Sequence, residues 1–165
     1  MKLGTKGRYA VMAMADMACQ PMGEPVALMA ISARQNISLS YLEQLFNRLR
    51  KAGLVRSIRG AHGGYVLARP AAEINVARVM EAVAEPMSAT GCDGDPDHGC
   101  RGTERCITHD LWHELDRQIE GFLLTVSLAD VVGKSGRNGH NGLSLLTGAA
   151  KREAGPTERR SSNPS

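Results

Sequence analysis

Three segments in the first part of the chain place apolar residues at helical spacing. The first predicts a helix that Thr5 caps and that runs to about Ala18. Residues 27–35, ALMAISARQ, predict a short helix, and residues 39–53, LSYLEQLFNRLRKAG, predict a longer one that ends at its glycine. The longer helix carries one apolar stripe that we expect to be buried, because its members recur at i, i+3, i+4 and i+7: Leu42, Leu45, Phe46 and Leu49.

Only the turn NIS separates the second predicted helix from the third, a pairing typical of a helix-turn-helix whose second helix enters the major groove of DNA. Residues 54–59 and 65–69 then alternate like short strands on either side of a glycine-containing loop, which predicts a β-hairpin wing. We therefore predict a mainly α fold with a winged helix-turn-helix DNA-binding domain over residues 1–84.

A second apolar pattern predicts a long helix over residues 104–125. Its apolar stripe must be buried, either within the monomer or in a two-fold dimer that would place two recognition helices on palindromic half-sites. We favour the dimer, with a dimerisation unit over residues 104–133 that ends in the short capped helix SLADVVG. The predicted dimer-interface residues are Ile107, Leu111, Leu115, Ile119 and Phe122.

The formal net charge of +3 at pH 7 conceals three differently charged segments. Residues 1–69 hold ten Lys and Arg against three Asp and Glu, residues 70–133 hold four against twelve, and residues 134–165 hold six against two. A basic first segment suits a nucleic-acid surface, because neutralised phosphates release condensed counterions. A solvated basic face is the alternative that charge alone leaves open. The last segment is rich in Gly, Ser, Arg and Asn and predicts a disordered tail.

The exposed face of the predicted recognition helix and the tip of the wing supply the candidates for DNA contact. Arg59, at the wing tip, is placed to enter a minor groove, where narrowing enhances the negative potential. Glu43 has two interpretations: it forms a capping box with Ser40, or its carboxylate accepts a hydrogen bond from cytosine N4. The predicted DNA-binding residues are Ser38, Ser40, Tyr41, Glu43, Gln44, Arg59 and Gly60.

Three of the four cysteines lie in residues 91–110, GCDGDPDHGCRGTERCITHD, and a histidine follows the last of them. No apolar run is long enough to span a membrane and the N-terminus lacks a signal segment, so we expect a cytoplasmic protein whose thiols stay reduced. The cysteine cluster then predicts metal binding or catalysis rather than disulfides. Cys19, which ends the first predicted helix, we expect to be a small core residue.

The four candidate ligands are Cys92, Cys100, Cys106 and His109. Three cysteines and a histidine are a common structural zinc set, and thiolates suit iron-sulfur clusters equally. The spacing C-x7-C-x5-C-x2-H has two wide loops that zinc knuckles generally lack and that can span a two-iron unit. Cys106 and His109 would share a face in the first turn of a helix capped by Thr103, whose positive end favours a negatively charged centre.

Four stretches, RYAVMAM, ISLSYLEQLFNRLRKAGLV, RG followed by GGY, and CITH, together make the chain resemble the IscR-type family of winged-helix transcription regulators over about residues 1–133. The resemblance implies a homodimeric regulator of iron-sulfur cluster assembly genes that binds palindromic double-stranded DNA and holds a 2Fe-2S cluster through three cysteines and one histidine. It also implies a cluster-assembly scaffold protein as a partner.

The resemblance assigns the ligand role to the four residues named above, in a cluster-binding loop over residues 85–103 and the helix that follows, and gives Cys19 no counterpart. Two departures from the family pattern stand out: C-x7-C replaces an expected C-x5-C, and Ala61 and His62 replace more compact wing residues. A histidine ligand is lost when it is protonated, so the cluster should be labile, which suits a sensor.

Other functions compete with this one. A nitric-oxide or redox sensor of the same fold and a zinc-stabilised winged-helix regulator share all the predicted elements. An electron-transfer protein or redox enzyme would have no use for a wing and a basic first segment, and we therefore expect a regulator rather than an enzyme.

Overall fold

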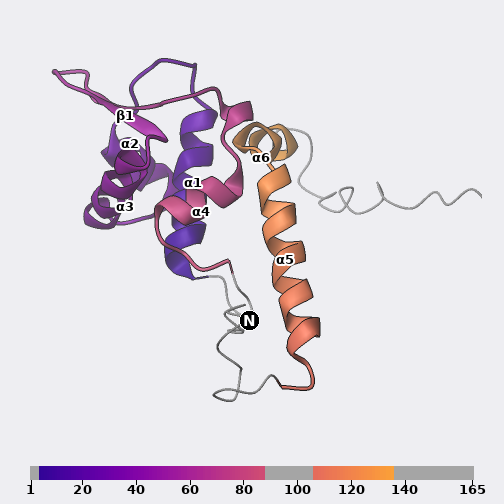
Figure 1. The fold of residues 1–165 in the computed structure, drawn as a ribbon. Helices are drawn as coiled ribbons and strands as arrows, with labels where there is room; N and C mark the ends of the chain where they lie inside the picture. Colours follow the sequence, from indigo (N-terminus) through magenta and orange to yellow (C-terminus); the bar gives the residue numbers. More distant parts are fainter. Residues whose placement is uncertain (1–3, 88–105, 136–165) are drawn as a thin grey trace, which may run out of the picture.

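The computed structural model describes residues 4–87 and 106–135. Figure 1 shows the N-terminal helices and the hairpin on one side of the molecule and a long helix on the other. The elements in chain order are α1 (Thr5–Ala18), α2 (Leu28–Gln35), α3 (Leu39–Lys51), β1 (Val55–Ile58), β2 (Gly64–Leu67), the 3-10 helix η1 (Ala71–Glu73), α4 (Val76–Ala82), α5 (His109–Thr125) and α6 (Leu128–Ser135). The predicted winged helix-turn-helix is therefore confirmed.

The predicted stripe of α3 forms the centre of the core. All four of its side chains are buried, and they join Ala10, Ala13 and Met14 of α1 and Ile31 of α2 in one apolar cluster. Burying a leucine or phenylalanine side chain of this kind contributes about 1.5–3 kcal/mol. Because the stripe is directed inward, the polar face of α3 is held outward.

Asn36 makes the turn between α2 and α3 possible. Its φ of 52° lies in the left-handed region, which Asn tolerates better than most residues. The Ser32 hydroxyl donates to the carbonyl of Ile37 at 2.6 Å, and the N–H of Ile37 donates to the carbonyl of Ser32 at 3.3 Å. The predicted NIS turn is thus fixed by hydrogen bonds on both sides of Asn36.

The wing pairs β1 with β2 in antiparallel register, Val55 with Leu67 and Ile58 with Gly64. Tyr65 of β2 ties the wing to the helices, because it forms a bridge with Val26 before α2 and its ring lies 4.9 Å from that of Phe46 of α3. The hairpin is therefore packed against the recognition helix.

Helix α4, which we did not predict, leads into a segment that contacts the DNA-binding helices. Arg48 of α3 donates to the Val83 carbonyl at 3.4 Å, and Lys6 of α1 donates to the Ala84 carbonyl at 3.1 Å. Ala84 itself has a φ of 54°. We refer to residues 83–85 as the connecting segment, because the predicted cluster-binding loop begins within it.

Glu85 completes these contacts at the N-terminus of α1. Its carboxylate accepts a hydrogen bond from the Gly7 N–H at 3.3 Å, where the helix dipole favours a negative charge. A Cβ on Gly7 would lie 2.6 Å from Cγ of Glu85, so the glycine is needed for this close approach.

The C-terminal helices are anchored to the body where α5 meets α6. The N–H of Val76 donates to the Val126 carbonyl, and the N–H of Leu128 donates to the Ile74 carbonyl, each at 2.9 Å. The predicted capped helix is confirmed as α6, whose Ser127 hydroxyl accepts from the N–H of Asp130 at 3.1 Å. It continues through Ser135, two residues into the segment predicted as a tail, and the remainder of that segment lies outside the described residues.

Three local predictions are wrong. Helix α1 has Gly4 at its N-cap, so Thr5 lies within the helix and does not cap it. Cys19 does end α1, but it is exposed and no core residue, because the apolar face of the helix has turned away by that position. The long helix begins at His109, preceded by a turn, and therefore neither starts at residue 104 nor has Thr103 as its cap.

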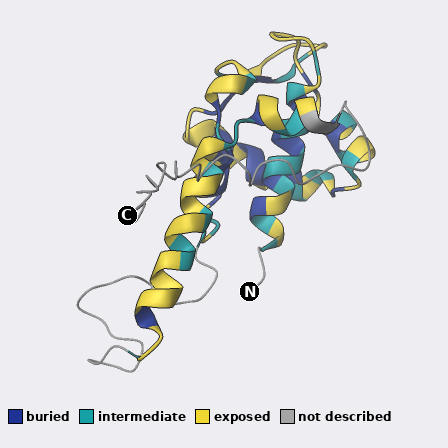
Figure 2. Cartoon of the chain, turned by 90° about the vertical axis from the view of Figure 1, so that its right-hand side faces the viewer, coloured by how far each residue is buried: buried dark blue, intermediate teal, exposed yellow. Residues whose placement is uncertain are grey.

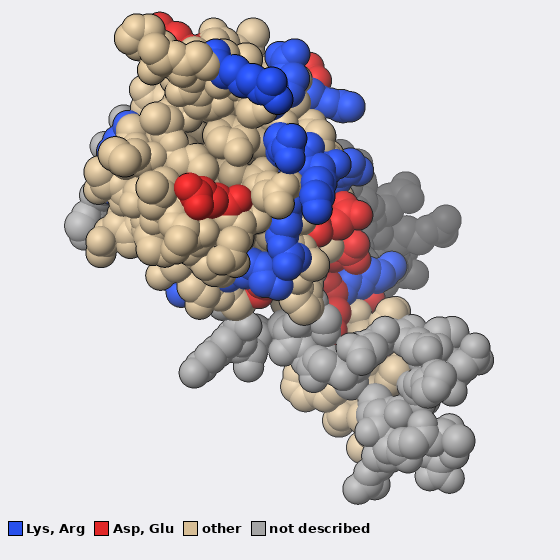
Figure 3. Space-filling model, turned by 90° about the vertical axis from the view of Figure 1, so that its left-hand side faces the viewer, with Lys and Arg blue, Asp and Glu red and all other residues tan. Residues whose placement is uncertain are grey.

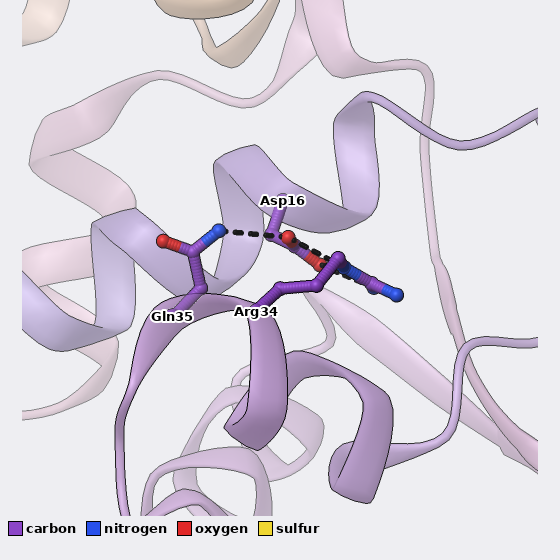
Figure 4. Close-up of polar contacts among 3 residues, drawn as sticks. All are labelled: Asp16, Arg34 and Gln35. Carbon is purple, nitrogen blue, oxygen red and sulfur yellow. Dashed lines mark hydrogen bonds and ion pairs between the residues drawn. The ribbon is translucent and has the colours of Figure 1, made fainter.

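Asp16 of α1, which is buried, links α1 to α2 through an ion pair with the exposed Arg34, drawn in Figure 4. Its carboxylate lies 2.6 Å from Nη2 of Arg34 and accepts a further bond from Gln35 at 2.8 Å. Burial opposes ionisation of Asp16, but the hydrogen bonds from Arg34 and Gln35 outweigh burial and hold the pKa of Asp16 below its usual range.

We expect Asp16→Asn to lower the free energy of unfolding at pH 7 by about 1–3 kcal/mol, because Arg34 and Gln35 lose a charged acceptor. The depressed pKa means that this stabilisation is present above about pH 4 and is lost as the pH falls through the folded-state pKa. Urea unfolding at several pH values, with Glu24→Gln at an exposed acid as control, measures both effects. Equal losses for Asp16→Asn at pH 7 and pH 2 would contradict the assignment.

Candidate DNA interface and metal ligands

The polar face of α3 is exposed where the recognition helix begins. Ser38 occupies the N-cap, and Ser40, Glu43 and Gln44 are exposed on the first two turns. Tyr41 is half-buried, with its ring 6.0 Å from that of Tyr9 in an edge-to-face contact. The predicted contact residues on α3 therefore lie on one accessible surface, except that the ring of Tyr41 also supports the packing of α1.

The capping-box interpretation of Glu43 is wrong. Helix α3 starts at Leu39 with Ser38 as its N-cap, which places Ser40 inside the first turn, and no side chain makes the cap hydrogen bond. Glu43 is exposed and lies a full turn into the helix. Its carboxylate is consequently not required for helix initiation, and the alternative of base contact stays a prediction.

Arg59 and Gly60 lie in the exposed loop between β1 and β2. Gly60 has a φ of 119°, which L side chains rarely adopt, and its carbonyl accepts from the N–H of Gly63 at 3.0 Å. A Cβ on Gly63 would lie 2.5 Å from the Ile58 carbonyl oxygen. These glycines close the loop tightly, and the loop carries Arg59 at the end of the wing.

Figure 3 shows Lys and Arg side chains gathered in a band across the side of the molecule that carries α2, α3 and the hairpin. Exposed basic residues on these elements include Arg48, Arg50 and Lys51 in the last turn of α3 and Arg56 on β1. The same elements that carry the predicted contact residues thus also carry positive charge, which can neutralise DNA phosphates.

Of the four predicted metal ligands, Cys106 and His109 are described, and Cys92 and Cys100 lie outside the described residues. The N–H of His109 donates to the carbonyl of Cys106 at 3.0 Å, so a tight turn brings the two residues together at the N-terminus of α5. Cys106 is half-buried and His109 is 7% exposed. Within residues 4–87 and 106–135, no three His, Cys, Asp or Glu side chains are grouped to hold a metal.

Three residues near Cys106 and His109 contribute contacts that the sequence did not suggest. Oγ1 of Thr108 lies 3.5 Å from Sγ of Cys106 and accepts a hydrogen bond from Nε1 of Trp112 at 3.0 Å. His113, one turn after His109, stacks with its ring 6.3 Å from that of His109. A threonine at the start of a helix, followed four positions later by a tryptophan, is the sequence signal that could have predicted the contact between Thr108 and Trp112.

Helix α5 is mostly exposed (Figure 2). Leu111 is 61% exposed and Phe122 is 45% exposed, whereas Leu115 and Ile119 are half-buried. Ile107 precedes the helix and is fully exposed, so it does not belong to the helical stripe. Leu124, which we did not predict, is 49% exposed.

These features define a class: a helix-turn-helix followed by a hairpin, with an exposed polar face on its second helix, is a winged-helix DNA-binding protein. The model of the Rrf2 family, iron-dependent transcriptional regulators, matches residues 3–134, and the chain belongs to the Rrf2 family. No helix among the described residues is apolar over a length that would cross a bilayer.

Relatives with assigned roles are regulators rather than enzymes. The HTH-type transcriptional regulator IscR of Serratia proteamaculans (strain 568) is 54% identical over 132 residues, covering 80% of this chain and 79% of that protein. The regulator of the same name from Photorhabdus laumondii is 55% identical over the same length, with the same coverage.

Two solved structures show the same fold. CymR (YrzC), the global cysteine regulator of B. subtilis, matches with a TM-score of 0.68 and 34% identity over 81% of this chain and 98% of that one. IscR of T. potens matches with a TM-score of 0.66 and 39% identity over 82% of this chain and 88% of that one. The chain is therefore a transcriptional regulator of this family, and the predicted resemblance is confirmed.

We expect Glu43→Ala to relax base preference at one cytosine-bearing position of an operator by about 1–3 kcal/mol, because a carboxylate that accepts from cytosine N4 is lost. Binding to a panel of single-base operator variants measures the change, with Glu24→Ala, at an exposed acid outside the predicted contact residues, as the control. Thermal stability should stay at the wild-type value, since Glu43 does not cap α3. An unchanged base preference would show that Glu43 does not read the operator.

Proposed function

We propose that this protein is a homodimeric, DNA-binding transcriptional regulator that senses iron-sulfur cluster supply through a 2Fe-2S cluster held by Cys92, Cys100, Cys106 and His109. It controls genes of cluster assembly and acquires its cluster from an assembly scaffold protein. The observation that carries the proposal is the close pairing of Cys106 with His109 at the positive end of α5, in a chain whose relatives are named IscR.

The chemistry of the described ligands fits such a group. Cys106 supplies a soft thiolate and His109 an imidazole, a donor set that iron-sulfur clusters and zinc both accept. The four-residue turn from Cys106 to His109 holds the pair together before any metal is bound, so these two ligands require little reorganisation. When bound, the cluster supplies a redox-active, acid-labile centre whose presence depends on cluster supply.

The connecting segment, residues 83–85, supports a route from the cluster to the DNA. The predicted ligand loop begins at its last residue, and the segment contacts α3 through Arg48 and α1 through Lys6 and Gly7. A change in the loop can therefore bias the position of the recognition helix. Coupling of this type is typically worth about 1–3 kcal/mol, enough for a fivefold to hundredfold change in affinity.

Operator titrations with three forms of the protein test the proposal. Anaerobically purified wild-type protein is expected to contain iron and acid-labile sulfide, and Cys92→Ala should lose both while it remains folded and binds some DNA. Because cluster and DNA bias the same equilibrium, Cys92→Ala should match chemically stripped wild-type protein across a panel of operator fragments and differ from the cluster-loaded form.

Cys19→Ala is the matched control for this experiment, because Cys19 is exposed at the end of α1 and is not a proposed ligand. It should keep the cluster and the operator preference of wild-type protein. Equal affinities of all forms on every fragment would refute sensing, and zinc in place of iron and sulfide would favour a zinc-stabilised regulator. Operator choice that follows nitric oxide rather than cluster content would favour the alternative sensor.

The proposed dimer uses the apolar face of α5. Within this helix His109 is the one buried residue, so the helix is not packed into the body along its length. A two-fold pairing would cover the exposed stripe and place two copies of α3 on palindromic half-sites.

We expect Phe122→Lys to dissociate the dimer. Two-fold symmetry places the substitution in both subunits, so it removes two apolar side chains from the interface and buries two charges there. Loss of about 1.5–3 kcal/mol per side chain weakens dimerisation by more than about a hundredfold. Sedimentation velocity at several concentrations measures it. Glu120→Lys places a lysine at an exposed position on the opposite face of the same helix and should stay dimeric. A wild-type dissociation constant for Phe122→Lys would exclude this face.

A further inference from the structure

The first turn of α5 uses its N-cap residue in an unusual way. Thr108 occupies the N-cap, where a threonine hydroxyl usually accepts a hydrogen bond from a backbone N–H of the first turn. The side chain of Thr108 makes no such cap bond. Its hydroxyl lies instead between the indole of Trp112, at 3.0 Å, and the sulfur of Cys106, at 3.5 Å.

Donor chemistry sets the direction of these two contacts. An indole N–H can only donate, so the Thr108 oxygen accepts from Trp112. The single hydroxyl proton of Thr108 is then available for donation toward Cys106. A Cys106 thiolate, the form that binds a metal, can only accept a hydrogen bond. Only one direction is then possible: Trp112 donates to Thr108, and Thr108 donates to Cys106.

The backbone keeps this arrangement in place. The N–H of Trp112 donates to the Thr108 carbonyl at 3.2 Å, which places the two side chains one helical turn apart on the same face. The turn from Cys106 to His109 holds the sulfur on the other side of Thr108. The hydroxyl is thus oriented before any metal binds.

We propose that Thr108, oriented by Trp112, is a positioning residue that donates a hydrogen bond to the Cys106 sulfur and tunes the bound cluster. This inference rests on the function proposed above. Hydrogen bonds to the sulfurs of a cluster help to set its reduction potential, because they stabilise the more negatively charged reduced form. They also orient the ligand, and loss of such a partner typically weakens metal binding about 10- to 100-fold.

The test compares Thr108→Val, which removes the hydroxyl at nearly constant shape, with Thr108→Ser, which retains it. The full chain is purified anaerobically, and its cluster is reduced by one electron from dithionite through redox mediators, with no bond made or broken. The Val variant should show a more negative reduction potential and should lose iron to a chelator about tenfold faster or more. The Ser variant should lie close to wild-type protein in both measurements.

Two further variants separate the hydrogen bonds from general effects on the helix. Trp112→Phe keeps an aromatic ring without the N–H, and should shift the potential in the same direction as Thr108→Val by a smaller amount. Thr125→Val makes the same chemical change at the other end of α5, where the hydroxyl donates to the Phe122 carbonyl at 2.8 Å. It should leave the potential and the iron retention unchanged.

The contact can also be measured without a cluster. Trp112 is the one tryptophan of the chain, so the apo protein gives a single indole N–H resonance in a nitrogen-15 correlation spectrum. Thr108→Val should move this resonance toward the position of an indole without a protein acceptor, and Thr125→Val should not.

The possible outcomes separate the role of Thr108 from the cluster-sensing function on which it rests. A cluster-loaded Thr108→Val protein with wild-type potential and iron retention would overturn the role of Thr108. An unmoved indole resonance in the apo variant would overturn the contact itself. Wild-type protein that binds no iron and sulfide would overturn the proposed function, and with it the tuning that rests on it, even if the indole resonance moves.

Discussion

Burial of the apolar stripe of α3 is the constraint on which the DNA-binding half of this protein depends. Phe46 lies at its centre, packed against α1 and edge-to-face with Tyr65 of the wing. With that side chain held, rotation of α3 about its axis would expose Leu42 or Leu49 to water, at a cost of about 1.5–3 kcal/mol each. The polar face of the recognition helix and the reach of the wing are therefore set by the same contacts, and DNA meets a preorganised surface.

The charged residues around this core have two different roles: exposed basic residues can contact DNA, and a buried acid links two helices. The basic residues of α3, β1 and the wing stand beside the face that would read bases, whereas Asp16 is drawn inside and neutralised by Arg34. Glu43 is the exception, an exposed acid on the recognition face. An acid there repels phosphates, so its placement is understandable if it reads a base edge rather than a backbone.

The second half of the protein depends on the first through few but specific contacts. Glu85 approaches α1 because Gly7 lacks a side chain, and α5 is attached to the body through the backbone bonds around Val126 and Leu128. Between these attachments α5 presents an apolar face to solvent, with His109 at its far end and Cys106 in the turn that precedes it. A change in the ligand region would then reach the winged helix through the contacts of residues 83–85 with α1 and α3.

The sequence by itself determined the elements whose signals are local. The spacing of the α3 stripe, the glycine that ends α3, the NIS turn and the alternation of the wing strands predicted a winged helix-turn-helix correctly, because each depends on the period or backbone preference of nearby residues. Cys106 and His109 do lie together, as predicted from their separation of three positions, but a turn before α5 joins them rather than the first turn of a helix. The two remaining proposed ligands stay a prediction.

Only the tertiary structure decided where elements end and what their side chains meet. The start of α5 at His109, the exposure of Cys19 and the role of Ser38 as N-cap of α3 could not be predicted, because neighbouring residues competed for each position with similar local preferences. The approach of Glu85 to Gly7 joins residues 78 positions apart in sequence. No local pattern encodes such a contact, since it exists only after packing has brought the two segments together.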